Sequence, residues 1–385
     1  MKTVLLVSKF NWDTPVEIPY IFKKAGFKVQ IYCPAQSWLT FSSFYETHFL
    51  APSEEEPFVL DLQQLVKQHK FDWVLLTEDP LIDLIKRSIQ DVALLLELLP
   101  IKNEQAIEVL SSKIGFSKYF QRNNIPTPVF KSYVNGVDLL DSLKEIQFPV
   151  LNKYDLSWGG EDMTISYTFE ELENKLQIIP SPATLLIQEY IDGEEIRVDA
   201  LFFQGKLLNY FCAKVLSNTK NQFSYTTRRS YYEYQELFFI LSSIGENIGA
   251  HGFANICFIK EKASGIHYLI EMDLRPNSWI AYSEHLSEYS FVYCLKNLQH
   301  SEKNDFPKGQ LKQPKIIELA LFYKDIRRAI WAKDLKGITR WLFGLKGYWR
   351  FLPFYDLRLS NKIFKEMWKE IGVFKVKQIK QKFSS

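Results

Sequence analysis

The chain has 385 residues, of which 46% are apolar and 24% are charged; this is ordinary for a globular protein, and the length predicts two or three domains. The net charge is only +2, but residues 311–385 carry +12 and residues 1–310 carry −10, so the acidic body does not favour nucleic acid as a substrate. Four scattered cysteines without a C-x-x-C pair argue against a disulfide framework or a zinc site and predict a reducing, cytoplasmic compartment.

The first hundred residues alternate between strand and helix patterns. Strands are expected at 3–8, 28–32 and 71–76. A helix over 16–25 ends at Gly26, which is a typical residue at the end of a helix. This order predicts an open parallel sheet covered by helices. No G-x-G-x-x-G sequence is present, so dinucleotide binding is not supported. The apolar run at 92–101 contains Glu97 and is far too short to cross a membrane.

The pattern changes after a long helix that is expected over 103–124. Strands are then expected at 128–133, 149–154, 162–167, 184–190, 196–203, 206–213, 254–259 and 267–271. Helices are expected at 137–146, 168–177 and 231–248. This mixture predicts an α+β region, and a polar joint near residue 310 then leads into a basic, helical tail.

The stretch LNKYDLSWGGEDMTIS, residues 151–166, allows two interpretations. Lys153 ends an apolar run, and Gly159 and Gly160 follow a few residues later. The stretch can be a strand, a glycine hairpin and a second strand, with the lysine at the surface. It can also be a lysine and a glycine loop that close over phosphates, since glycine allows close backbone approach. The local sequence alone favours the hairpin, so the choice depends on what lies on either side of the stretch.

A pair of acidic residues lies near the end of the α+β region. Period-two alternation places Glu271 and Asp273 on one face of a strand, and Arg275 shares that face if the strand continues. Two such carboxylates repel one another unless a cation lies between them. Mg²⁺ is usually held by one or two carboxylates together with substrate phosphates, so the pair indicates a magnesium site. The alternative is a sheet edge whose alternate residues face water.

Two further stretches flank the glycine loop. Upstream, Lys113 lies thirteen residues before Pro126 in an I-P-T-P turn, although a solvated helix lysine would look the same. Downstream, QEYI at 188–191 precedes the acidic pair Glu194 and Glu195, which could also be a strand that ends in an acidic turn. No one of these stretches is specific for a protein family by itself. Their combined order and spacing along the chain are specific.

Over roughly 105–280 the chain resembles the ATP-grasp superfamily of carboxylate–amine ligases, in the style of its carbamoyl phosphate synthase and biotin carboxylase branch. The resemblance implies a multidomain α/β and α+β protein with a Rossmann-like pre-ATP-grasp domain, a two-lobed ATP-grasp fold and a basic helical extension. The implied boundaries are 1–102 for the N-terminal domain, 103–190 for the small lobe with its linking helix, 191–308 for the large lobe and 309–385 for the extension.

The resemblance also implies the site residues. ATP phosphates would be bound by Lys113, Lys153, Gly159 and Gly160. The hinge that reads adenine would be Gln188, Glu189, Tyr190 and Ile191, and the ribose would be held by Glu195 or Glu194. Mg²⁺, or Mn²⁺ in its place, would be held by Glu271 and Asp273. The catalytic residues would be Arg275 and, as a weaker match, Lys214.

Two features depart from the family pattern. Glu161 and Asp162 follow the loop glycines and would repel phosphate if they pointed inward. Cys257 stands where the family commonly has Glu, Asp or Gln. Because a thiol is a poor magnesium ligand, one ion would be weakly held or Asn255 would substitute.

The activity that the resemblance implies is ADP-forming ligation. A carboxylate is activated as its acyl phosphate and is then attacked by an amine or another nucleophile. The substrates would be small molecules or acids and amines linked to lipid or glycan, and oligomer formation is left open. The alternative is an ATP-binding scaffold or regulatory protein of the same fold with weak or no turnover.

The tail at 311–385 sets tryptophans such as Trp341 and Trp349 among lysines and arginines. This pattern suits the surface of an anionic bilayer and predicts peripheral attachment to the inner membrane face. The alternative is a helical cap whose aromatic side chains are buried against the ligase, and the sequence leaves both open. RNA binding is less favoured, because no recognised module is present and the charge alone would bind without specificity.

Overall fold

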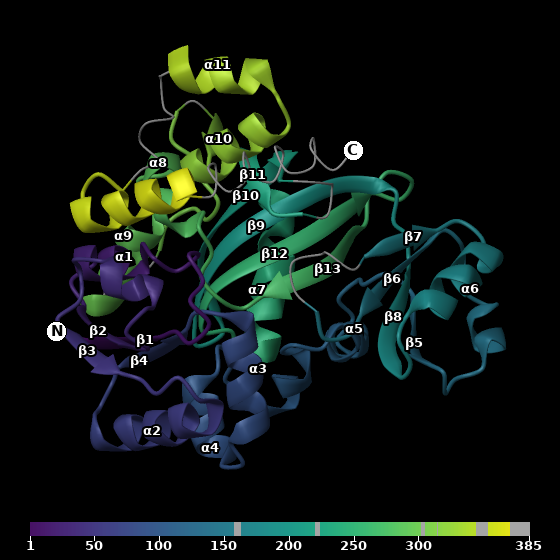
Figure 1. Cartoon of the computed structure of the whole chain (residues 1–385), viewed down its shortest axis with the longest axis horizontal. Coiled ribbons are helices and arrows are strands. Elements are labelled where there is room, and N and C mark those ends of the chain that lie inside the picture. Colours follow the sequence, from purple (N-terminus) through teal and green to yellow (C-terminus); the bar gives the residue numbers. More distant parts are fainter. Residues whose placement is uncertain (158–162, 220–223, 302–304, 314, 344–352, 370–385) are drawn as a thin grey trace, which may run out of the picture.

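The computed structural model describes residues 1–157, 163–219, 224–301, 305–313, 315–343 and 353–369. These residues form three β-sheets with helices packed around them (Figure 1). A parallel sheet comes first in the chain, a small antiparallel sheet with its own helix lies at one end of the molecule, and a six-stranded antiparallel sheet lies at the centre. The predicted combination of an α/β region with an α+β region is confirmed.

The N-terminal sheet has the strand order β3-β2-β1-β4, with all neighbours parallel. Its strands are β1 (Thr3–Val7), β2 (Lys28–Cys33), β3 (Thr47–Leu50) and β4 (Trp73–Leu76). The helices of this region are α1 (Ile18–Lys24), α2 (Glu55–Gln68), α3 (Asp79–Ser88) and α4 (Val92–Leu98). β1, β2 and β4 are mostly apolar and almost wholly buried, as expected of strands whose two faces are both covered.

The small antiparallel sheet has the order β5-β8-β6-β7. Its elements are β5 (Phe130–Asn135), β6 (Val150–Tyr154), β7 (Thr164–Ser166), β8 (Ala183–Glu189) and the helix α6 (Phe169–Ile178). It has a separate core, in which Leu172 and Leu176 of α6 pack on Val150 and Ile187. This unit is therefore a lobe of its own, and it carries the lysine singled out in the sequence.

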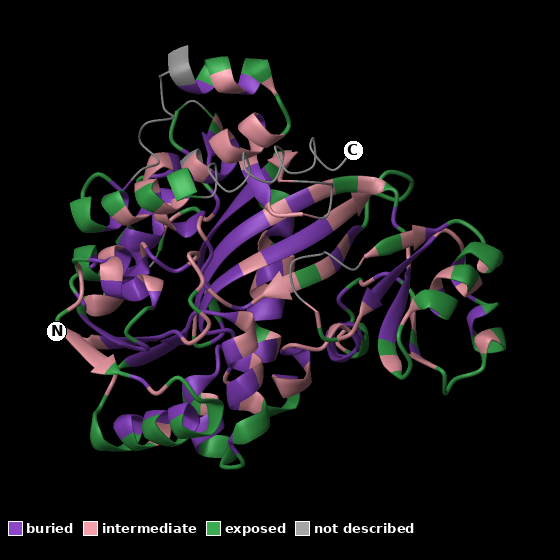
Figure 2. Cartoon of the chain, viewed as in Figure 1, coloured by how far each residue is buried: buried purple, intermediate pink, exposed green. Residues whose placement is uncertain are grey.

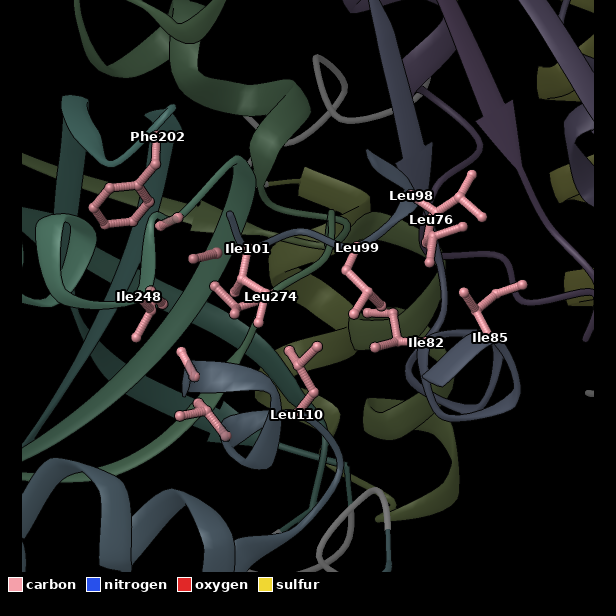
Figure 3. Close-up of a cluster of buried hydrophobic side chains, with 14 of the residues drawn as sticks. Leu76, Ile82, Ile85, Leu98, Leu99, Ile101, Leu110, Phe202, Ile248 and Leu274 are labelled. Atoms are coloured by element: carbon pink, nitrogen blue, oxygen red, sulfur yellow. The ribbon is translucent and has the colours of Figure 1, made fainter. Parts of the chain in front are cut away.

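The large sheet has the order β13-β12-β9-β10-β11-β14, with antiparallel neighbours throughout. Its strands are β9 (Gly193–Phe203), β10 (Lys206–Asn218), β11 (Thr226–Tyr232), β12 (Gly252–Glu261), β13 (His267–Asp273) and β14 (Ile316–Ala320). The helix α7 (Phe238–Ile248) packs on one face. Figure 3 shows how this core continues from Ile248 and Phe202 to Leu98 and Ile82 of the N-terminal region.

Three predicted helices are wrong in whole or in part. The helix expected at 137–146 is only a 3-10 helix at Leu140–Leu143. The region 103–124 is broken into a 3-10 helix at Glu104–Val109 and the helix α5 (Lys113–Arg122), because Ser112 caps the start of α5. The first part of the predicted helix 231–248 belongs to β11, and α7 begins only at Phe238. For 103–124 and 231–248, the predicted helix continued an apolar pattern past a boundary that hydrogen bonds determine.

The C-terminal extension begins with a strand. β14 pairs with β11, and it is followed by α10 (Phe322–Trp331), α11 (Leu335–Phe343) and a helix over 357–369. Trp341 is 3% exposed and donates its indole N–H to Asp325 at 2.9 Å, so its predicted role as a membrane anchor is wrong. Trp349 lies outside the described residues.

The extension is docked on the N-terminal region. Lys324 of α10 forms an ion pair with Asp13 at 3.1 Å, and Ser43 donates its backbone N–H to Asp356 at 2.7 Å. Leu359 and Ile363 join the apolar core that contains α1. Figure 2 shows buried positions on the helices of the extension. Within the described part of the chain, no helix has the length and apolar character needed to cross a membrane.

Candidate active site

A row of polar side chains crosses the face of the large sheet that points away from α7. The row consists of Glu195, Arg197 and Asp199 of β9, Asn255 and Cys257 of β12, and Glu271 and Asp273 of β13. Cys257 is the register partner of both Arg197 and Glu271, while Asn255 is the partner of both Asp199 and Asp273. Side chains of directly paired residues share a face, so these groups are neighbours.

Lys153 of β6 reaches this row from the small lobe. Its Nζ donates to Oε1 of Gln188 at 2.8 Å, and the lysine is only 5% exposed. Burial lowers the pKa of Lys153 to about 8, although the nearby Glu271 carboxylate acts in the opposite direction. The predicted phosphate lysine thus faces the predicted metal strand across the junction of the two lobes.

Lys113 is placed by the start of α5. Ser112 accepts the N–H of Gly115 at 2.8 Å and donates to Asp155 at 2.9 Å, which fixes the first turn of the helix. Nζ of Lys113 donates to the carbonyl of Ser157 at 2.7 Å. Burial lowers the pKa of Lys113, while Glu271 and other carboxylates raise it, so this lysine lies on the same side as the acidic row. Gly159 and Gly160 lie outside the described residues.

The segment between the lobes carries the predicted adenine hinge. The N–H of Glu189 bonds to the carbonyl of Val129 at 2.9 Å, and the N–H of Tyr190 bonds to the carbonyl of Pro149 at 2.9 Å. The side chain of Gln188 is turned toward Lys153. Among the described residues, none accepts a hydrogen bond from the backbone N–H of Ile191. That amide is therefore able to bind a ligand acceptor.

Arg275 joins the large sheet to the N-terminal region. Its guanidinium bonds to Asp79, at the start of α3, and to Asp273 at 3.1 Å, and it lies 5.2 Å from the ring centroid of Trp12. Burial raises the pKa of Asp273 to about 7, with Asp79 and Glu271 adding to the effect and Arg275 opposing it. Arg275 therefore sits where the carboxyl ends of β1 and β4 meet the large sheet, a place where α/β folds bind ligands.

Sequence reasoning missed a second buried arginine. Nη1 of Arg229 in β11 donates to both carboxylate oxygens of Asp199, at 3.0 and 3.1 Å, and the guanidinium lies 4.7 Å from the ring centroid of Trp279. Asp199 also accepts hydrogen bonds from Tyr231 at 2.7 Å and Asn277 at 2.8 Å. The charged alternation E-x-R-x-D at 195–199, inside an otherwise apolar strand, marks Asp199, but no local pattern marks its partner Arg229.

The comparisons with known proteins agree on one fold. Carbamoyl phosphate synthase large chain from Clostridium botulinum is 26% identical over 226 residues, which is 55% of this chain, and the chain spans 21% of that protein's length. The L-amino acid ligase structure from Bacillus licheniformis matches with a TM-score of 0.59 at 18% identity, covering 84% of this chain and 80% of the other. The ADP complex of N5-carboxyaminoimidazole synthetase from Staphylococcus aureus matches with a TM-score of 0.64 at 14% identity, covering 84% and 83%.

The chain has the ATP-grasp fold. No family model matches the chain. The two antiparallel sheets are the two lobes of this fold, and the row of polar side chains faces the junction between them. The resemblance seen in the sequence is therefore confirmed at the level of the fold.

Lys214 is not part of this ATP-grasp site. Ala213 pairs with Arg197, so the side chain of the next residue points to the opposite face of the sheet. There Lys214 forms an exposed ion pair with Glu194 at 3.0 Å. The expected catalytic role of Lys214 and the expected ribose role of Glu194 are corrected on this ground. Glu195, by contrast, shares the face of the row and bonds to Arg197.

The ATP-grasp fold implies a divalent ion at β13. Glu271 and Asp273 offer carboxylate oxygens, and Asn255 offers an amide oxygen, which suits Mg²⁺. Burial raises the pKa of the Cys257 thiol to about 12, so the thiol stays protonated and offers no hard ligand. Among the described residues, no three His, Cys, Asp or Glu side chains are grouped to hold a metal by themselves. The residues thus fit one ion that is completed by nucleotide and water, and fit a second ion poorly.

Proposed function

We propose that the protein is an ADP-forming, ATP-dependent ligase that joins a carboxylate to an amine. The observation that carries this is the gathering of Lys113 and Lys153 from one side of the lobe junction with Glu271, Asp273 and Arg275 from the other. Cationic groups for phosphates and carboxylates for a hard cation are the two halves of a nucleotide site. The proposal is supported by the ATP-grasp fold, which the solved ligases share.

The proposed roles follow from position. Lys113 and Lys153 neutralise nucleotide phosphates, and Glu189 to Ile191 present backbone groups to the base. Glu271, Asp273 and Asn255 would hold Mg²⁺, which supplies charge to the phosphates when it is bound. Most of the catalysis is then positioning of the substrates and neutralisation of charge, because phosphoryl transfer requires little covalent chemistry from protein side chains.

The carboxylate substrate is proposed to bind at Arg275. This guanidinium is preorganised by Asp79 and Asp273 and stacks on Trp12 at the edge of the parallel sheet. An incoming acid would compete with Asp79 for the guanidinium, since both are carboxylates. The site lies within the protein, between the N-terminal domain and the large lobe, which favours small-molecule acids and amines over lipid- or glycan-linked ones.

The four-part division at 1–102, 103–190, 191–308 and 309–385 remains part of the proposal. For the extension we propose a cap on the ligase rather than a membrane arm. The support is the burial of Trp341, Leu359 and Ile363 in the core that the extension shares with the N-terminal region.

The second candidate function is an ATP-binding scaffold without turnover, and Cys257 is the observation that favours it. The two candidates are separated by measuring ADP release from ATP with a panel of amino acids, small acids and amines. A ligase releases ADP only when an acid and an amine are both present. Glu271→Gln should abolish that release, whereas Glu236→Gln, a carboxylate exposed and paired with Lys260, should not. ATP binding by calorimetry without substrate-dependent ADP release would support the scaffold.

A further inference from the structure

Arg197 occupies a position that the resemblance does not explain. Three paired strands bring Arg197, Cys257 and Glu271 into one row, with the cysteine in the middle. Neighbouring strands lie about 4.8 Å apart, so the outer two residues are separated by roughly 10 Å at the backbone. Nη1 of Arg197 nevertheless lies 3.6 Å from Oε2 of Glu271. The guanidinium therefore reaches across the middle strand, and the small side chain of Cys257 leaves it room to do so.

The surroundings keep this guanidinium in place. Nε of Arg197 bonds to Glu195 on its own strand, so carboxylates lie on both sides of it. Lys153 lies close enough to Arg197, Cys257 and Glu271 for all three to influence its charge. Arg197 thus sits at the centre of the proposed phosphate site, and 19% of its side chain is exposed.

Arg197 and Cys257 together carry the same net charge as a carboxylate that holds a divalent ion. A neutral thiol together with a guanidinium carries one net positive charge. A carboxylate together with a divalent ion also carries one net positive charge. An arginine also presents fixed donors to phosphate oxygens in a fork that matches them. Arg197 with Cys257 can therefore replace the electrostatic effect of one metal ion without any metal ligand at position 257.

We propose that Arg197 is a nucleotide-binding residue that takes the place of a second divalent ion, so that the protein binds nucleotide phosphates with one Mg²⁺ held by Glu271 and Asp273. This rests on the proposed nucleotide site. Arg197 would turn from Glu271 toward the phosphates when nucleotide binds, leaving Glu271 free for the ion. The small side chain of Cys257 then leaves space for Arg197 to reach across the middle strand. A cysteine at this position does not by itself imply loss of activity.

The first test is the affinity of the full chain for ADP with Mg²⁺ and with EDTA, measured by calorimetry. Wild-type protein should retain ADP binding in EDTA. Arg197→Ala should lose roughly 10- to 100-fold of that metal-free affinity, as expected for a charge-assisted contact, and Arg197→Lys should lose less. The control Arg87→Ala removes an exposed arginine paired with Glu55 and should change nothing. Circular dichroism confirms that each variant is folded.

The second test counts ions. Mn²⁺ titrated into the ADP complex and followed by electron paramagnetic resonance should bind at one site per chain. The double variant Arg197→Ala/Cys257→Glu restores a carboxylate and removes the guanidinium, so it should bind two. Two Mn²⁺ ions in wild type, or unchanged metal-free ADP affinity in Arg197→Ala, would overturn the inference while leaving the proposed ligase standing. Failure of wild type to bind ADP even with Mg²⁺ would overturn both.

Discussion

Gln188 holds Lys153 in position by accepting a hydrogen bond from its Nζ inside the small lobe. Replacing Lys153 with Met keeps most of the apolar stem and removes the charge. We expect the affinity for MgATP to fall roughly 10- to 100-fold, since a charge-assisted contact is worth about 1.5–3 kcal/mol. Calorimetry measures the effect. The control Lys262→Ala removes an exposed lysine paired with Asp192 and should bind MgATP as wild type does.

The lowered pKa of Lys153 has a measurable effect on nucleotide binding. With a pKa of about 8, the lysine is mostly neutral at about pH 9 in the free protein. Nearby phosphates favour the charged form and raise that pKa, so nucleotide binding should take up a proton at this pH and weaken as pH rises above 8. Calorimetry in two buffers with different ionisation enthalpies reports the uptake. Equal uptake by Lys153→Met would show that another group titrates.

The residues of the candidate site that the sequence could bring together are those held in short local motifs. Lys113, Lys153, Glu271 and Asp273 each belong to such a stretch, and their facing positions follow from strand alternation. Arg229 could not be predicted, because its partner Asp199 lies on a strand two places away in the sheet, and only the register brings them together. Lys214 was misplaced for a related reason: a shift of one residue along a strand moves a side chain to the other face.

The helix α5 illustrates how an element places a functional side chain. Ser112→Ala removes both the cap of this helix and the hydrogen bond to Asp155. We expect the free energy of unfolding to fall by about 1 kcal/mol, as for other N-cap losses. Because Lys113 is the first residue of α5, the affinity for nucleotide should fall as well. Urea unfolding and calorimetry measure the two effects.

The control for this change is Ser142→Ala in the small lobe. Ser142 is exposed and bonds only to the carbonyl of Leu139 within its own turn. We expect its unfolding midpoint to stay within the error of the wild type. A larger loss there than in Ser112→Ala would contradict the importance given to the cap.

The predictions of helices and strands were most accurate where the hydrophobic periodicity agreed with residues that end such elements, for example glycine. Most of the strands were found within a few residues, and α1 ends before Gly26 as expected, but β3, β11 and β14 were not predicted. The region 103–124 failed because its apolar spacing continues through Ser111, whose positive φ of 69° breaks the helix. The sequence offers no strong breaker there, so only tertiary hydrogen bonds decide the boundary.

The whole molecule depends on the extension for part of its core. Trp341→Ala empties a buried site and removes one of the donors to Asp325, which keeps those from Thr227 and Arg328, so we expect a loss of about 3–5 kcal/mol in the free energy of unfolding. Trp368→Ala is the matched control, because Trp368 is 64% exposed and should cost little. Both are measured by urea unfolding.

A membrane anchor predicts the reverse behaviour. Trp341→Ala would then reduce sedimentation with anionic vesicles and leave stability unchanged. The sequence could not decide between these outcomes, because the basic and aromatic pattern of residues 311–385 fits both a bilayer surface and a cap. Only the tertiary contacts with Asp13 and the N-terminal core favour the cap.

The pairing of β11 with β14 has a consequence during synthesis. β11 ends at Tyr232 and β14 begins at Ile316, so at about 5–20 residues per second the ribosome makes the first strand several seconds before its neighbour. During that interval the outer edge of β11, beside Arg229, has no strand to pair with and is open to other nascent chains. We therefore expect chaperone binding or aggregation of stalled chains to depend on whether translation has passed residue 320, and the large sheet to be complete only after β14 has docked.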